Sequence, residues 1–96
     1  MLKKRRFQKQ NLVKVTFLLP DTPATRVHLM GDFNQWQQTV PMKRDRNNTW
    51  RATVDLEPGR EYQFRYLLDG ERWINDPEAD GYVPSPFGVE NSVVVT

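Results

Sequence analysis

Residues 49–70 read TWRATVDLEPGREYQFRYLLDG, and the spacing of the apolar side chains in this stretch decides the fold. The apolar residues fall on every second position in two runs, Trp50, Ala52, Val54 and Leu56, then Tyr62, Phe64, Tyr66 and Leu68. Alternation with a period of two is typical of half-buried β-strands. Pro58-Gly59 separates the runs and Asp69-Gly70 follows the second, and both dipeptides are turn signals. The stretch therefore predicts two antiparallel strands.

Outward from this pair, strand-like patterns recur in shorter segments, at residues 12–19, 26–30, 40–42, 72–74 and 92–96. No window sustains the 3.6-residue period of an amphipathic helix. Pro41 predicts an edge strand for residues 40–42, because proline cannot donate to a central ladder. Residues 75–90 are rich in Pro, Gly and Asp and predict a long loop, a kind of segment that often carries function. Six to eight short strands predict an all-β fold, an immunoglobulin-like antiparallel β-sandwich.

The composition bounds the class of protein. A chain of 96 residues predicts one domain with a single shallow core. It has no cysteine, which excludes a disulfide framework and a thiolate nucleophile or metal ligand. No apolar run is long enough to span a bilayer, and no small-residue cleavage site follows residues 12–19. We therefore expect a soluble, cytoplasmic protein with no membrane partner.

Positive charge is concentrated at the start of the chain. Five of the 14 Lys and Arg residues and none of the 12 acids lie in residues 1–10, which leaves nine basic and 12 acidic residues, a formal charge of −3, in residues 11–96. We expect residues 1–10 to form a basic flexible arm and residues 11–96 to form the single domain. Two interpretations of the arm are open: it binds phosphates or acidic partners, or it is a solvated terminus. The acidic remainder makes nucleic acid an unlikely partner.

Strand phase separates the three tryptophans. Trp50 is in phase with the apolar face of its strand and is expected in the core. Trp36 lies in a polar loop, and Trp73 stands beside Glu71 and Arg72. Two interpretations of this second pair are open: the rings form a stacking platform for a pyranose ring, or they fold over the ends of the sandwich as an outlying part of the core.

Arg65 alternates with the core residues of its strand. It is therefore expected on the opposite, outward face of the strand, where its planar guanidinium can donate several hydrogen bonds. The alternative interpretation of Arg65 is a cross-strand ion pair.

The order of these landmarks resembles a known family. Residues 27–36, VHLMGDFNQW, are similar to its GxFNxW signature, and later landmarks follow in the same order: Asn48-Thr49-Trp50, residues 62–66, Asp69-Gly70, Trp73, residues 75–77 and Asn91. The family is the early-set carbohydrate-binding module found at the N-terminus of isoamylases and glycogen-branching enzymes, and in the β subunit of AMP-activated protein kinase. The resemblance covers about residues 13–96.

The resemblance implies non-catalytic binding of an α-glucan such as glycogen or starch, with no cofactor and no metal. Trp36 and Trp73 would stack on the sugar, and Arg65 and Asn91 stand where the family has a lysine and an asparagine that hydrogen-bond to it. Phe87 matches a leucine that clamps the sugar, and Val89 replaces a frequent threonine. Glu71-Arg72 makes the step from Gly70 to Trp73 one residue longer than in the family, which predicts that the Trp73 ring is turned out of the plane of Trp36.

The sequence gives little support for an enzyme. Glycosidic hydrolysis normally uses two carboxyl groups about 5–10 Å apart, and the candidates are Asp69, Asp76, Glu78 and Asp80. Turn and loop chemistry explains Asp69 and Asp76, and a calcium loop built on Asp76, Glu78 and Asp80 lacks the remaining ligand pattern. His28, the single histidine, has no partner at a recognisable spacing.

The module is expected to target a partner, for example a glucan-metabolising enzyme, to polysaccharide. Two alternatives remain open. The chain is a protein–protein interaction module that keeps the fold without sugar binding, or it is an accessory piece of a glycoside hydrolase or branching-enzyme system.

Overall fold

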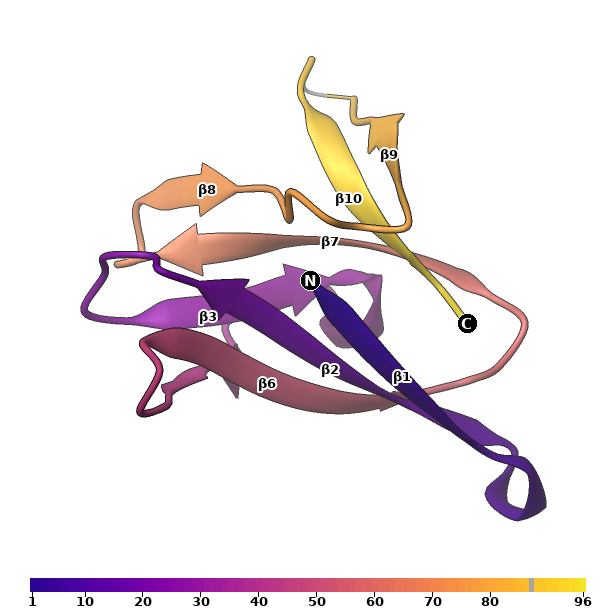
Figure 1. The fold of residues 1–96 in the computed structure, drawn as a ribbon. Helices are drawn as coiled ribbons and strands as arrows, with labels where there is room; N and C mark the ends of the chain where they lie inside the picture. The colour runs from indigo at the N-terminus through magenta and orange to yellow at the C-terminus, as the bar shows by residue number, and fades with distance from the viewer. Residues whose placement is uncertain (87) are drawn as a thin grey trace.

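The computed structural model describes residues 1–86 and 88–96 and shows two antiparallel sheets packed face to face (Figure 1). The four-stranded sheet has the order β1 (Leu2–Phe7), β2 (Leu12–Pro20), β6 (Thr49–Leu56) and β5 (Lys43–Arg44). The six-stranded sheet has the order β4 (Val40–Pro41), β3 (Val27–Gly31), β7 (Glu61–Leu68), β10 (Glu90–Val95) and β9 (Gly81–Pro84), and β8 (Arg72–Ile74) also pairs with β7. Two short 3-10 helices, η1 (Gln8–Gln10) and η2 (Asp32–Asn34), complete the described elements. The predicted all-β sandwich is confirmed.

The core lies between the sheets and follows the predicted alternation. Phe17 on β2 packs edge-on against Phe64 on β7, with ring centroids 5.0 Å apart. Phe64 in turn contacts Tyr66, at 5.7 Å. Trp50 is 5% exposed, which confirms its core position, and its Nε1–H donates to the Thr22 carbonyl at 3.0 Å. That bond satisfies the one polar group of a buried indole.

The described part of the chain has ten strands, more than the six to eight expected. The largest difference is at the start of the chain, where residues 1–10 were expected to form a flexible arm. Leu2–Phe7 instead pairs with Leu12–Phe17 along its whole length as β1. This strand gives no apolar alternation in the sequence, because its four cations are exposed. An edge strand tolerates such a run, since its charged side chains can stay in solvent.

The loop expected over residues 75–90 also contains a strand. Gly81–Pro84 forms β9, which pairs with β10 at the edge of the six-stranded sheet. Glycine and proline are tolerated there because an edge strand needs partners on one side only. By contrast, the prediction of an edge strand at Val40–Pro41 is confirmed, since β4 ends the same sheet on the other side.

One edge of β7 is shared by two partner strands. β10 pairs with the stretch from Glu61 to Phe64, and β8 pairs with Tyr66 to Leu68 on the same side. Arg65 is the residue at which the partner changes, so β8 and β10 diverge beside it (Figure 1). This divergence opens space on the outward face of the six-stranded sheet.

Candidate functional site

The site begins at Gly31, where β3 ends against β7. A Cβ atom added at Gly31 would lie 2.5 Å from the Gln63 carbonyl oxygen and 2.9 Å from Phe64 Cβ. Real Cβ atoms do not approach backbone oxygens so closely, so only glycine fits this position. The glycine of the VHLMGDFNQW stretch is therefore required by the close approach of two backbones.

Two polar side chains shape the turn that follows. Asn34 is 9% exposed, and its Oδ1 accepts the Gly31 N–H at 3.0 Å while its Nδ2 donates to the Leu29 carbonyl at 3.1 Å. Gln35 and Trp36 both adopt left-handed backbone angles, with φ of 54° and 57°. Such angles are uncommon for residues other than glycine and are held where the surroundings determine them. The buried Asn34 contacts are the restraint that presents Trp36 at the surface.

Asp32 fixes the orientation of the Trp36 ring. One carboxylate oxygen accepts the indole Nε1–H of Trp36 at 3.0 Å, and the other accepts the Gln63 N–H at 2.8 Å. The carboxylate therefore joins the indole to strand β7. Asp32 is not among the predicted site residues, and its spacing of four residues to Trp36 was the available signal.

Trp73 and Arg65 come from neighbouring strands. Trp73 lies opposite Leu67 in the β7–β8 register, so it shares the outward face with Arg65. The Arg65 guanidinium carbon lies 5.5 Å from the Trp73 ring centroid, a cation–π distance. Within residues 1–86 and 88–96, the Arg65 Nε is buried and has no hydrogen-bond partner. Its outward position is therefore confirmed, and the ion pairs of the described residues include none to Arg65, so they do not support the alternative of a cross-strand ion pair.

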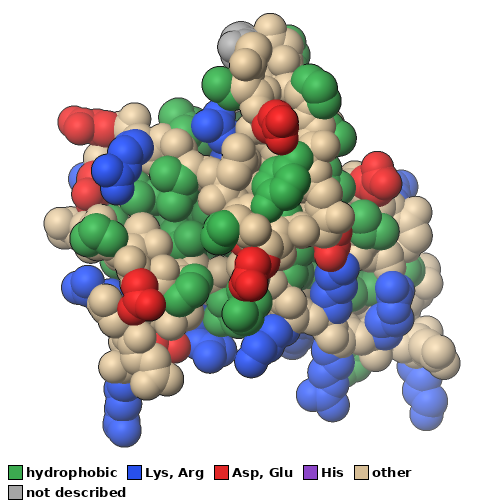
Figure 2. All heavy atoms as spheres, turned by 45° about the horizontal axis from the view of Figure 1, so that its top comes forward, with side chains coloured by type: hydrophobic (Ala, Val, Ile, Leu, Met, Phe, Trp, Pro, Cys, Tyr) green, Lys and Arg blue, Asp and Glu red, His purple; other side chains and the backbone are tan. Residues whose placement is uncertain are grey.

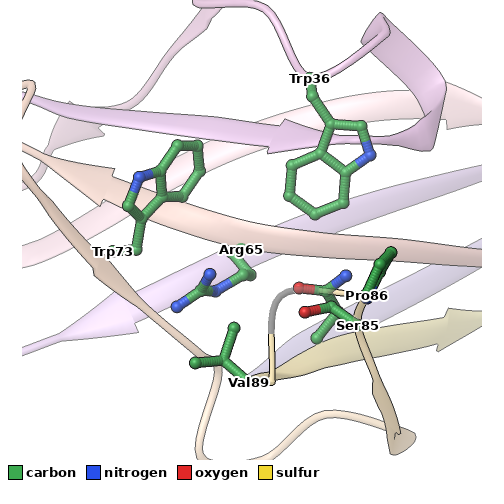
Figure 3. Close-up of a pocket in the computed structure, with 7 residues that line it drawn as sticks. Trp36, Arg65, Trp73, Ser85, Pro86 and Val89 are labelled. Atoms are coloured by element: carbon green, nitrogen blue, oxygen red, sulfur yellow. The ribbon is translucent and has the colours of Figure 1, made fainter.

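The two indoles meet over Arg65 (Figure 3). Their centroids are 6.3 Å apart and their planes are inclined by 54°. The rings are thus not coplanar, as the extra residue before Trp73 predicted. Trp73 is 38% exposed and Trp36 is half-buried, so each ring keeps accessible surface.

Asn91 reaches the same place from β10. Its neighbour Ser92 lies opposite Phe64, and one further step in this register brings Asn91 to the level of Arg65. Asn91 is 8% exposed, and its Nδ2 donates to Gln63 Oε1 at 3.0 Å. This bond fixes the amide of an otherwise mobile side chain.

These residues line one pocket with a volume of about 450 Å³ (Figure 3). Its lining brings together four of the five predicted site residues and adds three from the segment before β10: Trp36, Arg65, Trp73, Asn91, Ser85, Pro86 and Val89. The fifth predicted residue, Phe87, lies outside the described residues. The Ser85 N–H donates to the Val89 carbonyl at 2.7 Å, which ties these two residues together at the pocket. Ser85 and Pro86 were missed, and their place in the long loop was the only signal.

The acidic candidates have structural roles. Asp76 is fully buried, and its carboxylate accepts hydrogen bonds from the Tyr66 hydroxyl at 2.7 Å, the Glu78 N–H at 2.8 Å and the Met1 amino group at 2.6 Å. Burial and then the charge of Asp76 raise the pKa of Tyr66 far above its ordinary value. Asp80 pairs with Lys4 at 2.6 Å.

Asp69 closes its turn against β3. Its carboxylate accepts the N–H groups of Thr25 and Arg26 at 2.8 and 2.9 Å. The hydrogen bonds from Arg26 and then Thr25 lower the Asp69 pKa. Within the described chain, no carboxylate lines the pocket. The arrangement can stack and hydrogen-bond a ligand, and it lacks the paired acids of glycosidic hydrolysis.

A carbohydrate-recognition family matches almost the whole of this fold. Residues 13–95 match the family described as the glycogen recognition site of AMP-activated protein kinase. The chain belongs to this family of carbohydrate-binding modules.

Two relatives illustrate the family. The chain is 30% identical over 87 residues, 88% of its length, to the signal transduction protein MDG1 of Saccharomyces cerevisiae. It is 32% identical over 68 residues, 71% of its length, to the 5'-AMP-activated protein kinase subunit beta-2 of Homo sapiens. The aligned regions are 23% and 24% of those two proteins, so the chain corresponds to about a quarter of each. In the described part of the chain, no helix has the length and apolar character needed to cross a membrane.

Proposed function

We propose that this protein binds α-glucan, the α-1,4-linked glucose chains of glycogen or starch, without catalysing a reaction on it. The observation that carries the proposal is the convergence of Trp36, Arg65, Trp73 and Asn91 on one pocket in a chain of the glycogen-recognition family. The binding unit is a single domain, residues 11–96, and strand β1 extends its four-stranded sheet.

The chemistry of the pocket suits a sugar chain. An indole offers a flat apolar face to the C–H face of a pyranose ring, and two such rings stand side by side here. Their 54° inclination suits the curved path of an α-1,4-linked chain better than a flat polymer such as cellulose. The volume of about 450 Å³ lies in the range of small-ligand sites.

The polar groups of the pocket supply orientation. The Arg65 guanidinium carbon lies 5.5 Å from the Trp73 ring centroid, and a guanidinium carries five N–H donors that can meet sugar hydroxyls. The buried, unpartnered Arg65 Nε, in the described chain, supports the same role. Asn91 presents an amide held by Gln63, and Val89 adds apolar contact. Phe87 is included as an apolar clamp on the family resemblance.

The biological role that follows is targeting. A non-catalytic module with this pocket would bring a partner, such as a glucan-metabolising enzyme, to polysaccharide in the cytoplasm. The two relatives are named as a signal transduction protein and a kinase subunit, which favours a regulatory partner over a hydrolase.

Native-gel electrophoresis with glycogen or amylopectin in the gel tests the proposal. The wild-type protein should be retarded, and the Trp36→Ala/Trp73→Ala variant should migrate as it does without polysaccharide. Val95→Ala is a matched control, because Val95 is 42% exposed and lies outside the pocket. A wild type that is not retarded, or a double variant retarded as strongly as the control, would contradict glucan binding.

A further inference from the structure

The outward face of the four-stranded sheet carries a cluster of cations. Alternation along the strands and the register between them place Lys3 and Arg5 of β1 on this face with Lys14 of β2 and Arg51 of β6. Lys43 of β5 lies opposite Arg51. We call these five exposed residues the basic face. In Figure 2, Lys and Arg side chains gather along the lower rim of the molecule, on the side of this sheet.

Internal acids do little to neutralise the basic face. Arg51 is held by Asp45 at 2.8 Å, but the ion pairs of the described residues include none to Lys3, Arg5, Lys14 or Lys43. Asp55, opposite Lys14, is the one acid that the register brings to this face. The face therefore has a local excess of positive charge, although residues 11–96 as a whole are acidic.

The placement of the cations costs stability. Arg5 lies directly opposite Lys14 and Lys43 directly opposite Arg51, and like charges at opposed positions destabilise a sheet. All four side chains are exposed, so substitutions at these positions would relieve the repulsion without disturbing the core. A bound anion would also offset the repulsion between these cations, so the arrangement favours the binding of an anion.

The surface favours an acidic protein segment over nucleic acid. Among the described residues, Phe7 is the only aromatic side chain of this face, and Arg5 and Lys14 lie over that ring at 5.2 and 5.7 Å. The ring is thus already engaged by cations and is not open for stacking bases. Between the cations lie the hydroxyls of Thr16 and Thr53, 3.2 Å apart, which can donate hydrogen bonds to carboxylates. This mixture suits carboxylates and hydroxyls of a protein better than a continuous row of phosphates.

We infer that the basic face is a docking surface for an acidic, Asp/Glu-rich segment of a partner protein. The face belongs to the sheet opposite the one that bears the Trp36–Trp73 pocket. The two surfaces are therefore able to be occupied at once, and the protein joins an acidic partner to the ligand of the pocket. The inference does not depend on the identity of that ligand.

Fluorescence anisotropy with a short labelled polyglutamate peptide tests the inference. The wild-type protein should bind the peptide at low salt, with an affinity that falls as salt is added. Arg5→Gln/Lys14→Gln should bind about tenfold more weakly, because two exposed charge contacts are removed. Asp55→Asn should bind about twofold more tightly, because a repulsive acid is lost.

The matched control is Arg26→Gln/Arg60→Gln, which removes the same charge away from the basic face and should keep wild-type affinity. Retention by glycogen should be unchanged in all of these variants. Saturating peptide should also raise the melting temperature of the wild type more than that of Arg5→Gln/Lys14→Gln. Absence of peptide binding at low salt, or equal losses in the two double variants, would overturn the inference. Tighter binding of a single-stranded oligonucleotide of equal charge would overturn it in favour of nucleic acid.

Discussion

The two outward faces of this sandwich are built on the same kind of ladder and differ in what interrupts it. On the four-stranded sheet the strands remain paired, and exposed side chains project into solvent at regular positions. On the six-stranded sheet, β8 and β10 diverge from β7 at Arg65, and the turn after β3 brings Trp36 to the opening. The pocket that holds both surface tryptophans thus arises where a ladder is broken, whereas the unbroken ladder of the other sheet carries a row of charged side chains.

The position of Gly31 gives the largest expected effect. Gly31→Ala places a methyl group against the Gln63 carbonyl and Phe64, so the end of β3 must shift. We expect a loss of about 3 kcal/mol in the free energy of unfolding, measured by urea titration, together with loss of glycogen retention. Gly81→Ala is the control, because nothing lies within 4 Å of a Cβ at that position. Equal stability of the two variants would show that the close approach does not constrain the turn.

Asp32→Ala tests whether the carboxylate that holds the Trp36 ring is needed for glycogen binding. Asp32→Ala removes the acceptor of the Trp36 indole and leaves the Gln63 N–H without its partner. We expect glycogen affinity to fall about tenfold in affinity electrophoresis. The same substitution on the other face, Asp55→Ala, should leave glycogen affinity unchanged. If both variants bind glycogen like the wild type, the carboxylate does not position the ring.

Low pH tests how much the Asp69 carboxylate contributes to the stability of the fold. The Asp69 pKa is lowered in the folded protein, so its contribution to stability is complete above the unfolded value of about 4 and is lost as the pH falls through the folded value. Between about pH 5 and pH 2, thermal melting of Asp69→Asn should therefore show a smaller loss of stability than the wild type. Identical changes in stability for the wild type and Asp69→Asn over this pH range would show that the Asp69 carboxylate does not contribute to stability.

Lys43→Gln gives the smallest effect and has the opposite sign. Removing one member of the Lys43–Arg51 pair should raise the free energy of unfolding by about 0.5 kcal/mol in low salt. The gain should disappear in high salt, because screening removes the repulsion that it relieves. A loss of stability at low salt would mean that Lys43 is held by favourable contacts.

The fold was predictable where side chains alternate between core and solvent. Trp50 and the core residues of β7 follow from period two alone, and Pro41 marks an edge strand. β1 was not predictable, because its cations are exposed on an edge strand and leave no apolar alternation to detect. β9 was concealed for a related reason, since glycine and proline in an edge strand resemble a loop.

The site was predictable in its parts but not in its assembly. Arg65 was placed outward by strand phase, and the polar surroundings of Trp73 left stacking as one of two interpretations, whereas the role of Asn91 came from family resemblance alone. The split edge of β7, which brings Arg65 and Asn91 to the same level, depends on how β8 and β10 share one strand. Local pattern carries no information on such pairing. Asp32 was not among the predicted site residues because its function lies in a contact with an indole that only the folded turn creates.

The most direct test of the glucan pocket is the response of the three indole N–H signals in a ¹H–¹⁵N NMR spectrum during titration with maltoheptaose. The Trp36 and Trp73 signals should shift and saturate together, because their rings line one pocket. The Trp50 signal should stay in place, because its N–H is bonded to the Thr22 carbonyl inside the core. Unchanged Trp36 and Trp73 signals at saturating sugar, or an equal shift of Trp50, would contradict the account.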